Sequence, residues 1–233
     1  MSPYSCVISE KKQVYNRYTK QRFLLRKKRS MKRSETIFYE VHNGLYVNLT
    51  NKCSCACTFC IRNSSNQVGN ANTLWLDHDP SFKEAKEALD AINLDLYEEI
   101  VFCGYGEPTE ALDVLLKLAK EIKRRSATPI RINTNGHGSL INKRNIIPEL
   151  EGLIDAVSIS LNAPAAEKYY ELTRSNFGKE SFDAVIVFAK EVKKYIPSVT
   201  LTTVSTTLTS EEEEACKRLC EELGVTYRIR AWV

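Results

Sequence analysis

The chain has 233 residues, of which 43% are hydrophobic, and it carries a formal net charge of +4. This length and composition suffice for one large hydrophobic core. No apolar run approaches the roughly 18 to 20 residues that a membrane span needs, and the basic N-terminus lacks the apolar segment of a secretory signal. We therefore expect a cytosolic protein without membrane contact, whose eight cysteines do not form a disulfide framework.

The positive charge is concentrated at the N-terminus. Residues 1–34 contain eleven Lys and Arg and one acidic residue, whereas the other 199 residues contain 22 basic and 28 acidic side chains. The segment is either a solvated extension or an arm that contacts RNA or phosphate, with Tyr15, Tyr18 and Phe23 between the charges. A start at Met31 is a third interpretation, with an over-extended gene start before it. We expect a basic extension at residues 1–35 and a core domain at residues 36–233.

Beyond residue 36, short aliphatic or β-branched runs alternate with longer stretches in which apolar residues recur at helical spacing. The runs predict strands at residues 45–49, 99–103, 130–134, 156–161, 199–204 and 226–230. The stretches predict helices at residues 80–93, 111–125, 143–150, 165–172, 181–195 and 210–223. Asp79, Thr109 and Thr209 have N-cap chemistry, and Gly224 is placed to end the last helix. Six βα repeats predict a parallel sheet with outer helices, as a partial barrel or a doubly wound sheet.

Polar and glycine-rich segments follow the predicted strands, at the edge where α/β proteins carry their chemistry. They are GYGEPT after the second strand, NTNGHG at the end of the third, SLNAP after the fourth and STT after the fifth. Because loops are usually polar, each of these segments alone is weak support for a site.

Four cysteines lie close together after the first strand: Cys53, Cys55, Cys57 and Cys60. Cys53, Cys57 and Cys60 give the spacing C-x3-C-x2-C, which lets a short loop hold an iron-sulfur cluster from three sides. Three thiolates leave one iron of a [4Fe-4S] cluster open to a substrate or cofactor. The alternative is a zinc site with all four thiolates, but structural zinc normally draws ligand pairs from separated segments. We expect the cluster, with Cys55 outside its ligand set.

These features resemble the radical S-adenosylmethionine (SAM) superfamily. The resemblance rests on the C-x3-C-x2-C loop, on Phe59 before the last cysteine, and on Gly-Glu-Pro after the second strand. It covers nearly all of residues 44–233 and implies an α/β fold, a partial (βα)6 TIM-type barrel of parallel strands with outer helices. The segments YVNLTNKC, CTFCIRN, VFCGYGEPT, IRINTNG and AVSISLNAP resemble the TatD-associated branch of the superfamily, whose genes often lie beside TatD-type nucleases.

The resemblance implies an enzyme with two cofactors, a [4Fe-4S] cluster and SAM. Members of the family bind the SAM amino and carboxylate groups to the open iron and break the C5′–S bond with one electron from the reduced cluster. The resulting 5′-deoxyadenosyl radical abstracts hydrogen from a substrate. The electron requires a donor of low potential, so a flavodoxin or ferredoxin is the expected partner. No motif specifies the substrate, and activating-enzyme and modified-purine-type reactions are alternatives.

The resemblance also implies the residues that contact SAM. They are Phe59, Gly106, Glu107, Pro108, Thr134, Ser160, Asn162 and Thr202. In the family, backbone carbonyls of a Gly-Gly-Glu-Pro segment bind the SAM amino group, and here Tyr105 replaces the first glycine. Thr134 and Ser160 match positions whose hydroxyls contact SAM, and Asn162 replaces an acid that relatives often have. Loop capping is the alternative role for Thr134, Ser160 and Asn162.

The basic residues Arg62, Arg228 and Arg230 are candidates for binding a substrate carboxylate or phosphate, and solvated ion pairs are the alternative. His137 could transfer protons, although a lone loop histidine is usually a surface residue.

Two non-enzymatic functions are alternatives. A zinc or redox module would use the clustered cysteines, and a nucleic-acid-binding protein would use the basic segment. The remaining cysteines beyond residue 60, Cys103, Cys216 and Cys220, are expected in the hydrophobic core as small apolar side chains.

Overall fold

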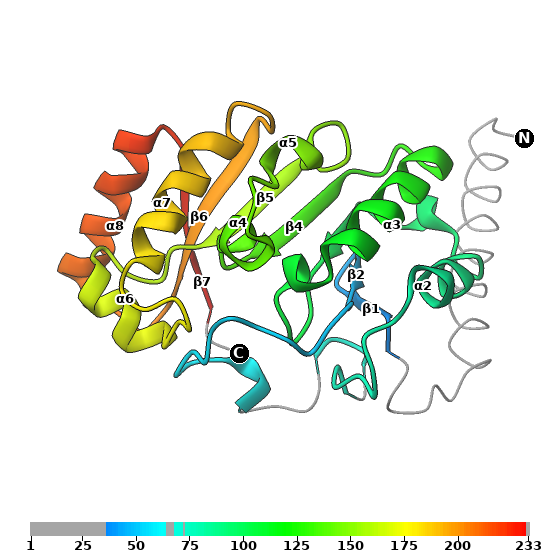
Figure 1. The fold of residues 1–233 in the computed structure, drawn as a ribbon, viewed down its shortest axis with the longest axis horizontal. Coiled ribbons are helices and arrows are strands. Elements are labelled where there is room, and N and C mark those ends of the chain that lie inside the picture. Colours follow the sequence, from blue (N-terminus) through cyan, green and yellow to red (C-terminus); the bar gives the residue numbers. More distant parts are fainter. Residues whose placement is uncertain (1–35, 64–67, 72, 232–233) are drawn as a thin grey trace, which may run out of the picture. The chain divides into compact units, whose positions relative to one another are not determined.

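In the computed structural model, residues 36–63, 68–71 and 73–231 are described, and seven strands form one sheet (Figure 1). The strands are β1 (Phe38–Val41), β2 (Gly44–Val47), β3 (Glu99–Phe102), β4 (Ile130–Thr134), β5 (Ala156–Ser160), β6 (Ser198–Val204) and β7 (Thr226–Arg230). They lie side by side in chain order. Strands β1 and β2 are antiparallel, and each later neighbouring pair is parallel. The sequence predicted β2 to β7 within two residues at each end.

Strand β1 was not predicted. It forms a hairpin with β2 through a turn in which His42 has a φ of 51°. The basic segment at residues 1–35 lies outside the described residues, together with Tyr15, Tyr18, Phe23 and Met31. Its interpretation and the domain boundary at residue 35 therefore stay predictions.

Most helices follow the strand after which they were predicted. They are α2 (Phe82–Leu89), α3 (Leu112–Arg125), α4 (Gly138–Asn142), α5 (Ile147–Leu150), α6 (Ala166–Thr173), α7 (Ser181–Val192) and α8 (Ser210–Leu223), with 3-10 turns η1 (Ile61–Asn63), η2 (Leu94–Leu96) and η3 (Pro108–Ala111). Of the predicted helix at residues 143–150, only the last turn forms, as α5. A separate helix, α4, precedes it, and its C-cap residue Lys143 has a φ of 53°.

Local capping explains where several helices begin and end. Thr209 caps α8 through a reciprocal capping box with Glu212, and Gly224 ends that helix with a φ of 65°, as predicted. The other two predicted caps are wrong. Ser81 rather than Asp79 caps α2, and the turn η3 before α3 is capped by the Glu107 side chain.

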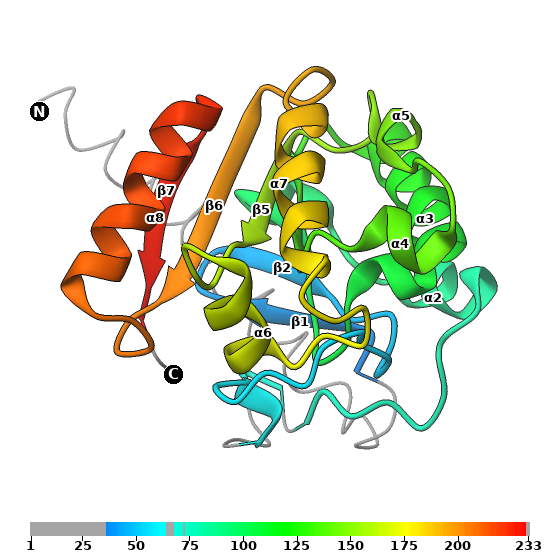
Figure 2. The same ribbon diagram turned by 60° about the vertical axis from the view of Figure 1, so that its left-hand side comes forward.

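The main hydrophobic core lies between the sheet and the helices that cover one of its faces (Figures 1 and 2). Alternate strand residues such as Ile100, Ile132 and Ile159 are fully buried there and belong to the same cluster as Leu115 of α3 and Val185 of α7. Because side chains alternate along a strand, the residues between them point to the other face. On β4, β5 and β6 those residues include Asn133, Ser158, Ser160 and Thr202.

A parallel sheet normally has two apolar faces. Here the second face is polar toward the carboxyl ends of the strands, which is typical of a site rather than of a packed core. No helix within the described residues is long and apolar enough to cross a membrane.

Candidate cofactor site

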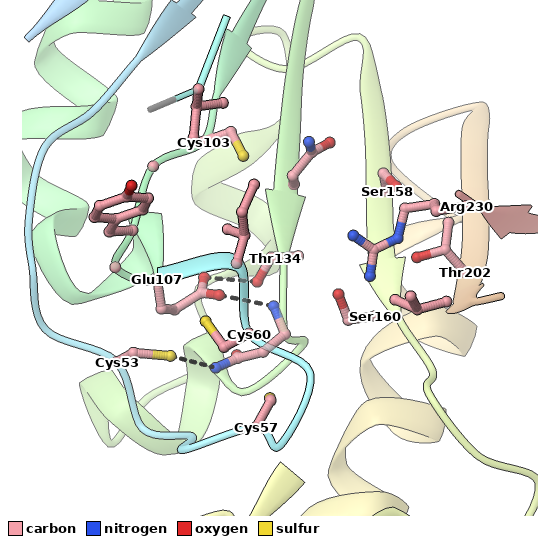
Figure 3. Close-up of a pocket in the computed structure, with 18 of the residues that line it drawn as sticks. Cys53, Cys57, Cys60, Cys103, Glu107, Thr134, Ser158, Ser160, Thr202 and Arg230 are labelled. Carbon is pink, nitrogen blue, oxygen red and sulfur yellow. Dashed lines mark hydrogen bonds between the residues drawn. The ribbon is translucent and has the colours of Figure 1, made fainter. Parts of the chain in front are cut away.

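A cavity of about 320 Å³ lies at the carboxyl ends of the parallel strands (Figure 3). Strands β4 to β7 contribute Thr134, Ser160, Thr202 and Arg230, and the segments after β2 and β3 contribute further polar residues. The volume lies within the range of small-molecule sites. Segments that are distant in sequence meet here because all parallel strands end at the same edge.

Ten of the eleven residues predicted to hold the cofactors line this cavity. They are Cys53, Cys57, Phe59, Cys60, Gly106, Glu107, Thr134, Ser160, Asn162 and Thr202. The exception is Pro108, which is buried in the first turn of η3 and is not among the described residues of the lining. The structure therefore brings the cysteine and strand-end segments together as expected.

The cysteine loop, residues 53–60, is anchored to the C-terminal end of α6 by backbone hydrogen bonds. The N–H groups of Ala56 and Thr58 donate to the carbonyls of Thr173 and Leu172, both at 2.9 Å. These bonds satisfy carbonyls at the end of a helix, which have no partner within it. These contacts hold the loop against the end of α6.

The four thiols of this loop have different surroundings. Cys53, Cys57 and Cys60 are half-buried, whereas Cys55 is buried and its Sγ lies 3.7 Å from the Asn135 Nδ2. Within the described residues, no three His, Cys, Asp or Glu side chains converge closely enough to hold one metal ion. Each thiolate ligand of a [4Fe-4S] cluster binds a different iron, so such ligands are spread apart. Three spread thiols on one cavity fit this cluster better than mononuclear zinc.

Glu107 connects the loops after β3 and β4. Its Oε1 accepts hydrogen bonds from the hydroxyls of Thr134, at 2.7 Å, and Thr109, at 2.8 Å, and its Oε2 accepts one from the Asn135 N–H at 2.7 Å (Figure 3). The side chain is 4% exposed. Burial raises the pKa of Glu107, and these hydrogen bonds oppose that rise. Glu107 thus braces two strand-end loops with its side chain.

Two glycines let the loop after β3 approach the segment after β2. A Cβ atom on Gly106 would lie 2.3 Å from the Thr50 carbonyl oxygen, and one on Gly104 would lie 2.1 Å from the Asn48 Oδ1. Glycine is therefore required at both positions. Between them, Tyr105 lines the cavity and its ring meets that of Trp75 edge-on, with centroids 5.1 Å apart. The departure from Gly-Gly-Glu-Pro thus places an aromatic ring at the cavity.

His137 is fully buried, so the prediction of a surface histidine is wrong. Its Nδ1 lies 3.2 Å from the Ser54 Oγ and its Nε2 lies 2.9 Å from the Tyr169 hydroxyl of α6. The Asn135 side chain donates to the same Ser54 hydroxyl at 3.0 Å. Burial lowers the pKa of His137 to about 4, so the ring is neutral at pH 7. His137 thus supports the cysteine loop through its contacts with Ser54 and Cys55, and only tertiary contacts reveal this role.

The opposite side of the cavity, which we name the β5–β7 wall, comprises Ser158, Ser160, Asn162, Thr202 and Arg230. Asn162 has a φ of 61°, and its Oδ1 is buried without a hydrogen-bond partner in the described structure. The Arg230 Nε is likewise buried and unpartnered there. Burial lowers the pKa of Arg230. Sequence reasoning missed Ser158, although its position two residues before Ser160 puts it on the same face.

The remaining predictions have mixed outcomes. Cys103 lines the cavity, so its assignment to the hydrophobic core is wrong. Cys216 and Cys220 are buried in the main core, as predicted. The Arg62 guanidinium donates to a carbonyl of the cysteine loop at 3.2 Å, and Arg228 is exposed.

Comparison with known proteins identifies the family. The model of the radical SAM superfamily matches residues 47–220. The chain belongs to this superfamily. Among curated proteins, uncharacterized protein MJ0804 of Methanocaldococcus jannaschii is 28% identical over 169 residues, which cover 71% of this chain and 50% of that protein. The radical SAM chain thus spans about half the length of the curated relative that it matches.

Solved structures of other proteins share the fold. Streptococcus suis SuiB bound to precursor peptide SuiA is 19% identical, with a TM-score of 0.60 over 84% of this chain and 40% of that one. TYW1 with a lysine-pyruvate adduct bound is 14% identical, with a TM-score of 0.55 over 95% of this chain and 80% of that one. A radical SAM methyltransferase from Sphaerobacter thermophilus is 16% identical, with a TM-score of 0.55 over 83% of this chain and 57% of that one. The predicted partial barrel of parallel strands is confirmed, and the family implies a [4Fe-4S] cluster and SAM as cofactors.

Proposed function

We propose that the protein is a radical SAM enzyme that cleaves SAM reductively and uses the resulting radical to abstract hydrogen from a substrate. One observation carries the proposal: three half-buried thiols with C-x3-C-x2-C spacing line the same cavity as the strand-end segments. We assign Cys53, Cys57 and Cys60 as the cluster ligands and leave Cys55 outside the set. Cys55 is the buried thiol of the four and its Sγ lies 3.8 Å from the His137 Nδ1, which supports this division.

The residues around the cavity fit SAM as well as a cluster. The methionine end of SAM needs acceptors for its amino group, and the loop of Gly104 and Gly106 brings backbone to the cavity without Cβ atoms. The ribose and carboxylate need polar partners. Ser160 and Thr202 supply hydroxyls, and the buried Asn162 Oδ1 has no partner in the described protein. A buried polar atom without a partner is costly unless a ligand satisfies it.

We assign the remaining predicted contacts, Phe59, Glu107, Pro108 and Thr134, to the same cofactor site, with different parts in it. Phe59 lines the cavity beside the cluster ligands. Glu107 and Thr134 contact each other, so they hold the loop that presents the backbone. Pro108 is the first residue of η3 and directly follows the lining residue Glu107, so it fixes the start of that turn. The chain's own residues therefore bind, orient and shield the cofactors.

When bound, the reduced cluster supplies one electron to the SAM sulfonium, which yields methionine and a 5′-deoxyadenosyl radical. Radical SAM enzymes need a reductant, and we propose a flavodoxin or a ferredoxin in this role. The segments quoted from the sequence support the TatD-associated branch, and with it a functional link to a TatD-type nuclease. Activating-enzyme and modified-purine-type reactions are the alternatives for the overall reaction.

We also propose that the core domain spans residues 36–233 and that residues 1–35 are an extension of it. If that extension binds nucleic acid, its affinity should fall steeply with salt and vanish in a chain that starts at Met31.

The test is an anaerobic assay of the reconstituted protein with SAM and dithionite. We expect 5′-deoxyadenosine to form only when both SAM and the reductant are present. The same protein should be brown and contain about four irons per chain. A colourless protein that binds zinc and forms no 5′-deoxyadenosine would show that the cysteines belong to a zinc or redox module instead.

A further inference from the structure

Arg230, at the end of β7, is a half-buried cation without a counter-ion in the described structure. Its Nε is buried and has no hydrogen-bond partner, and within the described residues its side chain takes part in no ion pair. Among the described residues of the lining, Arg230 is the one cation and Glu107 the one carboxylate. Buried charges in proteins are normally paired, because removing a charge from water is costly.

Among the described residues, the other charged side chains near the cavity already have hydrogen-bond or ion-pair partners, and the Cys103 thiol is neutral. The Glu107 carboxylate is held by the loops after β3 and β4. Glu99, on the inner face of β3, forms a two-bond ion pair with Arg131 at 2.7 and 2.9 Å. Burial raises the pKa of Cys103, so this thiol stays protonated at pH 7 and does not balance the charge of Arg230. Within the described residues, the charge of Arg230 is thus left without a partner, which makes it available to a ligand.

A hydroxyl group accompanies this charge. Ser158, on β5, lines the cavity, and its side chain makes no hydrogen bond to another described residue. A guanidinium beside a hydroxyl is suited to a carboxylate or phosphate, because the guanidinium offers several charge-assisted hydrogen bonds in a fixed plane.

The position of Arg230 and Ser158 separates them from the proposed cluster ligands. Figure 3 shows Cys53, Cys57 and Cys60 toward one end of the close-up, whereas Cys103, Ser158 and the Arg230 guanidinium lie toward the other. Glu107 and the loop that it braces lie across the cavity from Arg230 (Figure 3). Arg230 and Ser158 therefore line a part of the cavity away from the cysteine loop.

We propose that Arg230, with Ser158, binds an anionic group of the substrate, a carboxylate or a phosphate. The inference rests on the proposed function, because it assigns the cysteine end of the cavity to the cluster and SAM. It names the class of substrate: a small molecule or residue with a negative charge that enters the cavity on the side of Arg230.

The test uses anaerobically reconstituted protein with SAM bound, and inorganic phosphate and acetate as probes. Thermal denaturation is followed at constant ionic strength, with chloride as the reference anion. We expect at least one probe to stabilise the wild-type protein saturably. In Arg230→Met the apparent affinity for that probe should fall at least about tenfold, because a charge-assisted hydrogen bond is lost. Arg228→Met, an exposed neighbour on the same strand, is the matched control and should behave like wild type.

The two probes distinguish the source of the anion, since a phosphate site should prefer phosphate and a carboxylate site acetate. The affinity of each variant for SAM is measured in parallel by equilibrium dialysis. Unchanged SAM affinity in Arg230→Met, with loss of the probe, supports a substrate site. A comparable loss of SAM affinity would overturn the inference and assign Arg230 to the SAM carboxylate. Absence of saturable binding in wild type, or an equal loss in Arg228→Met, would also overturn it.

These outcomes are separate from failure of the proposed function. That failure would appear as wild-type protein without a cluster or without 5′-deoxyadenosine formation. If only the substrate site is wrong, the wild-type protein should still hold its cluster and form 5′-deoxyadenosine.

Discussion

The two sides of the cavity differ in how their polar groups are satisfied. On the side of the loops after β3 and β4, Glu107, Asn135 and His137 form a buried network with Ser54, with contacts between 2.7 and 3.2 Å. On the β5–β7 wall, the Asn162 Oδ1 and the Arg230 Nε are buried without a partner in the described structure. The named network is satisfied within the protein, whereas these two atoms of the β5–β7 wall are not. The Asn48 Oδ1, which lies against Gly104 and outside the described lining, is also buried without a partner.

This difference separates scaffold from recognition. A satisfied buried network rigidifies the groups that it connects, and here it connects the cysteine loop to two strand ends. Buried polar atoms without partners lower stability unless a ligand supplies the partner. Substitutions in the network should therefore affect the folded protein before any ligand binds. Substitutions in the β5–β7 wall should mainly affect ligand affinity.

The largest expected effect belongs to the cysteine loop itself. Cys57→Ala should lose the cluster and all 5′-deoxyadenosine formation, because one of three thiolate ligands is removed. Cys55→Ser should keep the iron content of wild type, because its thiol faces Asn135 and His137. Iron analysis and the absorbance of anaerobically reconstituted protein measure both. A lost cluster in Cys55→Ser would contradict the division of the four cysteines into three ligands and one support.

His137 makes the network sensitive to acid. Its folded-state pKa is lowered from 6.5 to about 4 by burial. Below pH 6.5 the unfolded chain takes up a proton that the folded chain does not, so the free energy of unfolding should fall as the pH drops toward 4. The loss should reach about 3.4 kcal/mol at most, from the difference between a pKa of 6.5 and one of about 4 at 1.36 kcal/mol per pH unit. Urea denaturation of chelated, cluster-free protein at several pH values measures it.

The pH dependence needs a control, because carboxylates titrate in the same range. His137→Gln should lose this part of the pH dependence, whereas His78→Gln should keep it. His78 is exposed, and its hydrogen bond to Glu84 raises its pKa, which gives the opposite sign. An unchanged pH profile in His137→Gln would contradict a neutral, buried histidine.

Glu107→Gln should weaken the same network at neutral pH. The amide keeps one acceptor oxygen but places an NH2 group against either the Asn135 N–H or the hydroxyls of Thr109 and Thr134. Loss of charge-assisted hydrogen bonds in a buried site should cost about 2 kcal/mol of unfolding free energy. Urea denaturation without SAM measures it. Glu110→Gln on the same turn is the control, and an equal loss there would show that charge rather than bracing matters.

The sequence predicted those parts of the protein whose causes are local. The last helix was predicted at its observed bounds because its apolar spacing, the Thr209 cap and Gly224 lie within that segment. The C-x3-C-x2-C spacing likewise lies within eight residues, so the expected ligands were identified before the fold was known. Alternation on β4 to β6 also follows from the sequence, although it was applied to Ser160 and not to Ser158.

The rest depended on contacts between distant segments. His137 is buried only because Tyr169 and Ser54, on other elements, meet its ring. Glu107 braces Asn135 because β3 and β4 are neighbours, so its motif alone did not reveal the role of the side chain. Strand β1 is four residues long and stable only as the partner of β2. Pattern within a segment carries no information on such pairings.

The smallest expected effect concerns Asn162, where backbone and side chain suggest different roles. Asn tolerates the observed φ of 61° better than most residues, so the residue could be there for the turn alone. Its unpartnered Oδ1 instead suggests a ligand contact. Asn162→Gly keeps the turn and removes the amide, whereas Asn162→Ala removes the amide and strains the turn by about 1 kcal/mol. The pair therefore separates the two roles.

If the amide binds SAM, both variants should lower SAM affinity by a similar factor, roughly fivefold, from the loss of one neutral hydrogen bond of about 1 kcal/mol. Only Asn162→Ala should also lower the unfolding free energy without ligand. Equilibrium dialysis with SAM and urea denaturation measure the two effects separately. Wild-type SAM affinity in Asn162→Gly would show that Asn162 serves the turn. The unpartnered oxygen would then be a cost of the fold, and the contrast between the two sides of the cavity would rest on Arg230.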